Sequence, residues 1–469
     1  MLITLAAPAF AETWYIENGD ITVKASGTEG KNTVSQGNKK DVEDTNTIIT
    51  NQKTDTASSN PVTIEAGNDK VEVTLKDVNI DVSKQSKAAV SVTGSGNTTI
   101  KLDGDNHLTG GNGIYSNSRG SLTISGDEND SLTAQGGDSR NGIYSVSGDV
   151  TISGGTVTAT GGNSTGIVGY GGSGIYSSSG VAISGGAVTA NGGDSKDGYG
   201  GNGIYSSSVA ISGGTVKAAG GNGKDGYGGN GISSTSTTIS GGTVTANGGS
   251  GNSSGGNGIR SNGVTISGGA VNAAGGDGGN GKDGGYGIIS NDIDLSGSLE
   301  LTAKAGSPNG KALSQRGNEL DLDDIKDKLG PGAKVTATDA NGETKQVSIP
   351  RPVEPEEPSS SSGGGSATPS APASPLPGLT VTDKSGAVIS YTSTQSGNTL
   401  TVCVGRLTAS LRASLSALRQ LRAEGIETIT FQTILCSTTL SVDELLAMGG
   451  EDAEAVLTHR LTDSSLTVG

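Results

Sequence analysis

This sequence is poor in aromatic and basic residues and in the side chains that most often carry chemistry. Aromatic residues make up 3% of its 469 residues, and it has two histidines and two cysteines. The formal net charge is −16, and nucleic-acid phosphates repel such an acidic chain, so no nucleic-acid partner is expected. The sequence has no run of the roughly 18 apolar residues that a membrane-spanning helix needs, so no transmembrane segment is expected.

The scarcity of histidine limits the enzymes that the chain could be. His107 and His459 fall in different predicted domains, so no Ser-His-Asp or Cys-His arrangement can be assembled economically. A polysaccharide lyase would need carboxylates beside a Lys or Arg on one face. Five residues in neighbouring repeats keep that alternative open, namely Asp103, Asp105, Arg119, Asp138 and Arg140. We expect no enzyme, because acidic turn residues in a solenoid are usually solvated.

Glycine, by contrast, is abundant and periodic. Between Gly113 and Ser290 the chain repeats a Gly-Ile-x-Ser step, an Ile-Ser-Gly-Gly step, a Val-x-Ala step and a Gly-rich loop seven times, with some variation. The first steps lie 27 to 32 residues apart and begin at Gly113, Gly142, Gly174, Gly203, Gly231, Gly258 and Gly287. A period of this length is typical of a solenoid.

The residues within one repeat indicate which solenoid this is. The apolar pieces are short and β-branched, alternate with Ser or Thr and are separated by Gly pairs, which is typical of strands. Three short strands per repeat predict a parallel β-helix with about 28 residues per coil. The fold class that we expect is therefore mainly β, with a linker and a small α/β domain after the β-helix. The second and third columns of axial side chains are expected at Ile124, Ile152, Ile183, Ile211, Ile239, Ile266 and Leu295, and at Leu132, Val157, Val188, Val216, Val244, Val271 and Leu301.

Changes of composition divide the chain into six segments. We expect a signal-peptide remnant at 1–11, an N-terminal cap with irregular first coils at 12–110, regular coils at 111–304 and a C-terminal cap at 305–347. A disordered linker at 348–378 holds eight of the twelve prolines, and the small domain occupies 379–469. The apolar start with its Ala-Phe-Ala cleavage pattern predicts secretion, with cleavage after Ala11.

Within the small domain, the segment LTASLRASLSALRQLRAEG predicts an amphipathic helix with a stripe at Leu407, Leu411, Leu415 and Leu418. Ser441 and Glu444 form a capping box that opens a second helix. Both cysteines, Cys403 and Cys436, fall in this domain. A disulfide between them and two buried thiols are equally open alternatives, because the sequence gives no separation between them.

The residue after each Ile of the Gly-Ile-x-Ser step should point outward. In four successive repeats this residue is Tyr, at Tyr115, Tyr144, Tyr176 and Tyr205. With coils about 4.8 Å apart, the rings predict a flat aromatic strip on which sugars could stack. The alternative is that the stacked rings only stabilise the sheet.

The Gly-rich loops predict a second kind of site. GGNGKDGYG at 220–228 fits the calcium β-roll pattern, GGDSKDGYG at 192–200 nearly fits it, and GGNGKDGGYG follows later. Calcium is therefore a candidate cofactor, with ligands at Asp194, Asp197, Asn222, Asp225, Asn280 and Asp283. Each copy recurs only once per coil, however, so solvated turns are the alternative.

Residues Trp14 to Lys304, with WYIENGDITV, GSGNTTIKLDGDNHLTG and the repeats VTISGGTVTATGG and GIYS, resemble the bacterial secreted carbohydrate-binding domain family. That family is built on a right-handed, pectate-lyase-like β-helix. The resemblance implies an extracellular or cell-surface protein that binds a polysaccharide, with calcium in some members. A structural or adhesin stalk without glycan affinity is the alternative. We expect a monomeric solenoid.

Overall fold

The computed structural model describes residues 12–350, except 29, 167 and 168, and residues 378–468, except 384, 385, 390, 397, 405, 407, 434–436, 449–452 and 460–463. The predicted signal-peptide remnant, most of the predicted linker and Cys436 lie outside the described residues. The chain divides into two compact units, Met1–Glu354 and Pro355–Gly469.

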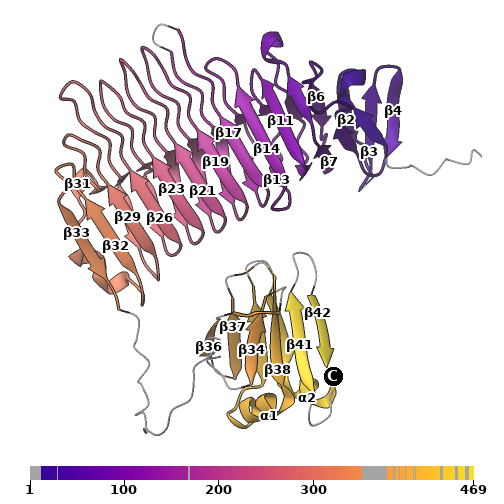
Figure 1. The fold of residues 1–469 in the computed structure, drawn as a ribbon, viewed down its shortest axis with the longest axis vertical. Helices are drawn as coiled ribbons and strands as arrows, with labels where there is room; N and C mark the ends of the chain where they lie inside the picture. Colours follow the sequence, from indigo (N-terminus) through magenta and orange to yellow (C-terminus); the bar gives the residue numbers. More distant parts are fainter. Residues whose placement is uncertain are drawn as a thin grey trace, which may run out of the picture. The chain divides into compact units, whose positions relative to one another are not determined.

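The first unit is a parallel β-helix of about 12 turns, spaced roughly 28 residues apart, as the repeats predict. Figure 1 shows its strands stacked coil on coil, with long loops projecting along one side. Each coil supplies strands to three columns, and each strand pairs in parallel with the equivalent strand of the next coil.

The first column contains the Gly-Ile-x-Ser strands and the strands that continue the column in the preceding and following coils. Its members are β2 (Ile21–Ala25), β6 (Val62–Glu65), β9 (Val90–Thr93), β12 (Ile114–Ser116), β15 (Ile143–Ser145), the first halves of β18 (Ile175–Ile183), β20 (Ile204–Ile211) and β22 (Ile232–Ile239), then β24 (Ile259–Arg260), β27 (Ile288–Ser290) and β30 (Leu313–Gln315).

The second column contains the Ile-Ser strands. Its members are β1 (Thr13–Tyr15), β5 (Ile48–Thr50), β7 (Val71–Lys76), β10 (Thr98–Asp103), β13 (Leu122–Ser125), β16 (Val150–Ile152), the second halves of β18, β20 and β22, then β25 (Gly263–Ile266) and β28 (Asp292–Leu295). In three coils the first two strands are therefore continuous, where separate short strands are expected. Their corners are mostly Ser and Thr, with one glycine, Gly180, in β18.

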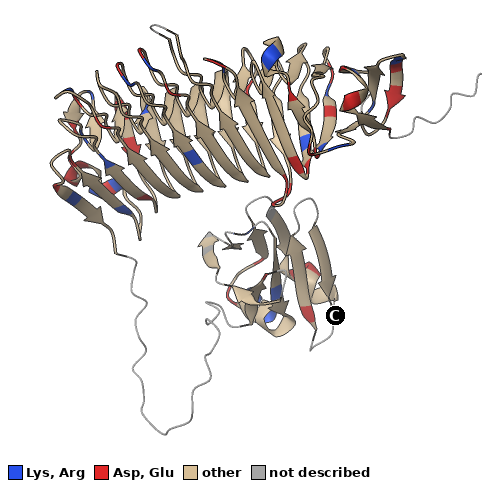
Figure 2. Ribbon diagram, turned by 45° about the horizontal axis from the view of Figure 1, so that its top comes forward, with Lys and Arg blue, Asp and Glu red and all other residues tan. Residues whose placement is uncertain are grey.

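The third column contains the Val-x-Ala strands. Its members are β8 (Asn79–Asp81), β11 (Asp105–Gly110), β14 (Ser131–Gly136), β17 (Thr156–Thr160), β19 (Ala187–Asn191), β21 (Thr215–Ala219), β23 (Thr243–Asn247), β26 (Ala270–Ala274), β29 (Glu300–Lys304) and β32 (Lys334–Thr338). Figure 2 shows few charged residues on the strands of the regular coils, whereas charges gather on the turns and toward the ends.

The axis is filled by the predicted columns of aliphatic side chains. The residues expected in the second and third columns are all at most 3% exposed. Burial of each side chain contributes roughly 1.5–3 kcal/mol, and only where a neighbouring coil covers it. Stability is therefore shared between neighbours rather than held within one coil.

Antiparallel strands and short helices close the two ends of the β-helix. At the start, β3 (Asn32–Gln36) pairs with β2 and β4 (Lys39–Asp44). At the other end, β31 (Asn318–Glu319) pairs with β30, and β33 (Thr344–Ser348) pairs with β32. Among the described residues, 3₁₀ helices lie near the two ends at Ile16–Asn18 and Asp323–Lys328, and a third lies between β8 and β9 at Ser83–Gln85. The antiparallel strands cover edges that would otherwise offer unpaired backbone groups.

The described residues of the second unit form two sheets and two helices around a core of their own. One sheet is formed by β35 (Val388–Ile389), β34 (Leu379–Thr382), β38 (Ala409–Ser414), β41 (Glu454–His459) and β42 (Ser464–Val468). The other is formed by β36 (Thr392–Ser396), β37 (Thr399–Cys403), β39 (Thr428–Gln432) and β40 (Ser437–Ser441). The helices are α1 (Leu415–Ala423) and α2 (Val442–Met448).

The first predicted helix of this unit is wrong in its N-terminal half. Ala409 to Ser414 forms strand β38, in which Ala409, Leu411 and Ala413 are buried alternately. Helix α1 begins only at Leu415, where the Ser414 hydroxyl accepts a hydrogen bond from Ala417 N at 3.2 Å. Leucines four residues apart also satisfy a period of two, so the spacing is compatible with a strand. Leu407 lies outside the described residues.

Candidate ligand-binding groove

The Gly-Ile-x-Ser step places one side chain outward between two that point toward the axis. In β15, Ile143 and Ser145 are fully buried, while Tyr144 between them is only half-buried. The Ser145 hydroxyl donates to Gly148 O at 2.6 Å and so satisfies a backbone carbonyl at the corner between the first two columns. The step therefore needs an apolar residue for the axis and a small hydroxyl for the corner, and it leaves the outward residue free to vary.

The four predicted tyrosines form one continuous stack, which we call the strand ladder: Tyr115, Tyr144, Tyr176 and Tyr205. Successive ring centroids lie 5.6, 4.9 and 5.0 Å apart, with interplanar angles of 52°, 83° and 20°. The first two pairs are tilted or edge-on, and only the last is stacked face to face. Contacts of both kinds are favourable for aromatic rings at these separations.

A second stack, which we call the loop ladder, consists of Tyr170, Tyr199 and Tyr227. Its centroids lie 5.0 and 4.7 Å apart, with angles of 11° and 9°, so the three rings are nearly parallel and stacked. They are 62%, 41% and 43% exposed. This ladder was not predicted from the sequence, although each of its tyrosines precedes a Gly-Gly pair and they recur 29 and 28 residues apart.

The two ladders line the same groove, which encloses about 500 Å³. Tyr144, Tyr176 and Tyr205 contribute from the strand ladder, and Tyr170 and Tyr199 from the loop ladder. Between them lie the Gly-Gly-Ser and Gly-Gly-Asn segments, which lack bulky side chains. Glycine is required there, because a Cβ at Gly201 would lie 1.9 Å from Gly172 O. The groove is therefore bordered by aromatic rings and lined between them by backbone and small polar side chains.

Asparagines form a third row in the groove. Asn202 Oδ1 accepts from the backbone and side-chain amides of Asn230, both at 3.0 Å, and Asn230 Oδ1 accepts in the same way from Asn257. The side-chain NH₂ of Asn202 has no hydrogen-bond partner among the described residues, which leaves it available as a donor. Polar groups of this kind fix the orientation of a ligand held by apolar contacts.

The Tyr144 phenol is uncharged at neutral pH. Burial raises the pKa of Tyr144, the neighbouring Tyr176 and Tyr115 raise it further, and Arg140 opposes them. A neutral phenol can both donate and accept a hydrogen bond.

The predicted calcium residues lie in the loops beyond these tyrosines. Asp194 Oδ1 accepts from Asn222 N at 2.6 Å, and Asn222 Oδ1 accepts from Ser250 N at 2.9 Å, so these side chains connect one coil to the next. Asp194 and Asn222 line a hollow of about 270 Å³. Lys196 and Lys224, whose side chains carry ammonium groups, line the same hollow.

The remaining predicted ligands are not brought into one site. Asp283 O accepts from Gly255 N, just as Ser254 O accepts from Gly228 N one coil earlier. Asp283 therefore has the position in its loop that Ser254 has one coil earlier. Ser254 in turn pairs with Tyr227, so Asp283 is equivalent in position to that tyrosine and not to Asp225. Asn280 has a left-handed φ of 53°, and Asp197 and Asp225 lie in the preceding two loops. Among the described residues, no group of three or more His, Cys, Asp or Glu side chains could hold a metal.

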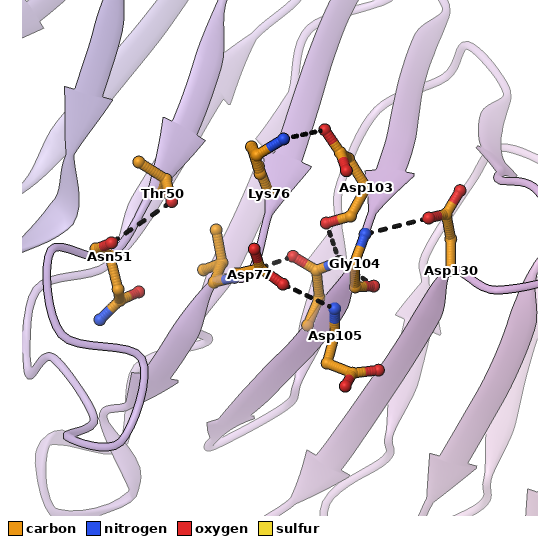
Figure 3. Close-up of polar contacts among 10 residues, drawn as sticks. Thr50, Asn51, Lys76, Asp77, Asp103, Gly104, Asp105 and Asp130 are labelled. Carbon is orange, nitrogen blue, oxygen red and sulfur yellow. Dashed lines mark hydrogen bonds and ion pairs between the residues drawn. The ribbon is translucent and has the colours of Figure 1, made fainter.

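The five residues that keep a lyase site open lie at three different corners. Asp103 and Asp105 flank the turn from the second to the third column, where Lys76 Nζ donates to Asp103 at 2.8 Å and Asp77 accepts from Asp105 N at 3.0 Å (Figure 3). Arg119 lies at the corner between the first two columns, whereas Asp138 and Arg140 lie in the loop from the third column to the first. The fold does not gather them into one acid–base site.

In the second unit, Cys403 Sγ lies 3.5 Å from Gln432 Oε1, and burial raises the pKa of the Cys403 thiol. The possible disulfide stays a prediction, since Cys436 lies outside the described residues. His459 is fully buried between Thr433 and Thr438, with its ring 4.7 Å from that of Phe431. Burial lowers the pKa of His459.

No helix among the described residues is long and apolar enough to cross a membrane. No protein-family model, curated protein or solved structure matches the chain.

Proposed function

We propose that this protein is an extracellular, non-catalytic protein that binds a polysaccharide in the groove between the strand ladder and the loop ladder. The observation that carries the proposal is the pair of tyrosine stacks lining one groove of about 500 Å³. A pyranose ring has an apolar face that stacks on an aromatic ring and a polar rim that needs hydrogen bonds. The groove offers apolar contact along the ring edges and at the ring faces that the ladders leave uncovered, and the amides and backbone groups between the rings provide hydrogen bonds.

The repetition of the groove suits a polymer. Equivalent tyrosines recur at centroid separations of 4.7 to 5.6 Å, so successive parts of an extended chain would meet the same surface again. The resemblance of residues Trp14 to Lys304 to secreted carbohydrate-binding domains points the same way. Secretion rests on the sequence of residues 1–11, and calcium at the loops also stays a prediction of the sequence.

Retention on insoluble polysaccharides, measured by pull-down and by affinity electrophoresis, tests the proposal. We expect the full chain to be retained and the double variant Tyr199→Ala/Tyr205→Ala to lose at least tenfold in affinity. Both side chains are about 40% exposed, so their removal should leave the core intact. Tyr15→Ala is the matched control, because Tyr15 is 37% exposed but lies in β1, outside the groove. Unchanged retention of the double variant would exclude the two ladders as the binding surface.

The second candidate is a structural or adhesin stalk without glycan affinity. It is favoured by a chain of backbone hydrogen bonds that links the loop arms, by which we mean the Gly pairs at the two ends of each loop. Gly201 N donates to Gly193 O within one loop, and Gly221 N of the next loop donates to Gly201 O, both at 2.8 Å. If the protein is such a stalk, the two ladders only stiffen the loops. The same double variant would then lower the melting temperature, and the wild-type chain would be retained on no polysaccharide.

A further inference from the structure

The groove does not end at Tyr205. A second hollow of about 650 Å³ shares Tyr205, Ser233 and Arg260 with the first and continues along the first column toward the C-terminal end of the solenoid. Its lining changes in character, because serines, threonine and asparagines replace the tyrosines and two arginines, Arg260 and Arg316, border it. The two hollows thus form one surface with an aromatic segment followed by an arginine segment.

The basic residues that line this surface are arginines and not lysines. Between residues 12 and 350 the chain has twenty lysines and four arginines. Three of those arginines, Arg140, Arg260 and Arg316, line the two hollows, and no lysine does. The guanidinium group presents paired donors that match a carboxylate, sulfate or phosphate, which the ammonium group of lysine cannot do.

The same surface lacks the opposite charge. No Asp or Glu lines either hollow, in a chain whose formal net charge is −16. None of the ion pairs among the described residues involves Arg140, Arg260 or Arg316. Their charge is therefore not neutralised by a neighbouring carboxylate and is available to a ligand.

Arg316 lies at a position whose backbone conformation ordinarily favours other residues. With Gly317 it forms the two-residue turn between β30 and β31, and both residues have positive φ, 51° and 83°. Turns of this type favour Asn or Gly at both positions. Arginine here carries a conformational cost that is not required for the turn itself. Its Nε donates to Asn291 O at 3.1 Å, which holds the side chain against another residue of the groove lining.

We infer that the arginine segment binds an oxyanion substituent of the ligand, so that the protein recognises a glycan bearing carboxylate, sulfate or phosphate groups beyond the part that stacks on the tyrosines. The inference rests on the proposed function. Arg260 lies two coils beyond Tyr205, which places the first anionic group roughly 10 Å from the last tyrosine of the strand ladder.

The test compares three hexasaccharide probes: a neutral β-1,4-glucan, an oligogalacturonate and a sulfated galactan. Affinities of the full chain are measured by calorimetry at low and at high salt. We expect at least one anionic probe to bind at least tenfold more tightly than the neutral one, with the advantage falling as salt rises. The two anionic probes distinguish a carboxylate from a sulfate as the preferred group.

The variant Arg260→Gln/Arg316→Gln should remove that tenfold advantage, so that the anionic and neutral probes bind it with similar affinity. Arg119→Gln is the matched control, since Arg119 is the one arginine between residues 12 and 350 that lies outside both hollows. Arg260→Lys/Arg316→Lys keeps the charge but should recover only part of the advantage, because it loses the paired donors. Melting temperatures verify that all variants fold.

The outcomes separate this inference from the proposed function. Equal affinity for neutral and anionic probes, or an anionic preference that survives the Arg→Gln variant, overturns the arginine segment alone. A preference that depends on the arginines but is insensitive to Tyr199→Ala/Tyr205→Ala overturns the aromatic groove and leaves the arginine segment standing. Wild-type chain that binds none of the probes overturns both.

Discussion

At the scale of single residues, glycine does two different things in this solenoid. The second glycine of each Ile-Ser-Gly-Gly step adopts a left-handed φ, such as 75° at Gly214, which a side chain would strain. The Gly pairs at the two ends of the loops, such as Gly192 and Gly193 or Gly200 and Gly201, have no such φ. They are needed because backbone packs directly on backbone, as at Gly201 against Gly172. The abundance of glycine therefore reflects close packing as much as turn geometry.

We expect Gly201→Ala to destabilise the solenoid by about 2–3 kcal/mol, because a rigid carbonyl 1.9 Å from the new Cβ must move. The shift of the thermal midpoint, followed by circular dichroism, measures the effect. Gly263→Ala is the matched control, since a Cβ there meets nothing within 4 Å and the residue has no left-handed φ. Its change should stay within about 0.5 kcal/mol. Equal effects of the two substitutions would disprove the close-packing argument.

His459 gives the second unit a defined dependence on pH. Burial lowers its pKa in the folded state, so the unfolded chain takes up the proton first. The stability that the neutral ring contributes is complete above the unfolded pKa of about 6.5 and is lost as the pH falls below it toward the folded value. The chain has only two histidines, so an NMR titration of the ring protons, assigned with His107→Gln and His459→Gln, measures the folded pKa directly. A midpoint at or above 6.5 for His459 would contradict the expectation.

At the scale of elements, the sequence predicts the solenoid strands well because one constraint dominates each of them. Every coil must place an Ile, Leu or Val on the axis, so residues such as Ile183 and Val188 reveal their column by recurrence alone. The segment from Leu407 to Gly425 has no such repeat. Leu407, Leu411 and Leu415, four residues apart, fit helical and strand periods equally. The alternately buried residues of β38 pair with β34 and β41, which local spacing cannot reveal.

The candidate site was only half predictable for a similar reason. The strand ladder follows from the alternation in Gly-Ile-Tyr-Ser, whereas the loop ladder depends on the path of irregular loops. Tyr170 and Tyr199 can be aligned by their spacing, but only the structure brings them into the groove beside Tyr176 and Tyr205. The calcium pattern around Asp283 led to the opposite error. It looks like a third copy of the loop motif, but it is displaced along its loop, so that Asp283 occupies the position that Tyr227 has in an earlier coil.

At the scale of the whole solenoid, the coil is the unit of both stability and recognition. Each strand pairs with the equivalent strand of the next coil, and the loop arms are linked in the same way, so contacts run between neighbouring coils. The outward residues change along this constant frame from Tyr to Ser and Arg, which divides one groove into two segments. Binding properties can therefore change coil by coil without altering the axis.

This modularity leads us to expect that a whole coil can be removed without loss of the fold. Deleting residues 203–230 joins Asn202 to Gly231, which follows the equivalent Asn230 in the native chain, so every column keeps its register. The deletion removes Tyr205 and Tyr227, one ring from each ladder. We expect a soluble β-rich protein whose thermal midpoint changes by a few degrees and whose polysaccharide affinity falls, because the groove is one coil shorter.

Deleting residues 203–216 is the matched control. It removes half a coil and joins Asn202 to Lys217, so one coil loses its first two strands and Ile175 and Ile183 lose the partners that cover them in the next coil, Ile204 and Ile211. The exposed axial side chains should make this variant insoluble or strongly destabilised, as judged by its thermal midpoint and by size-exclusion chromatography. If it were as stable as the whole-coil deletion, stacking of equivalent strands would not be what holds the solenoid together.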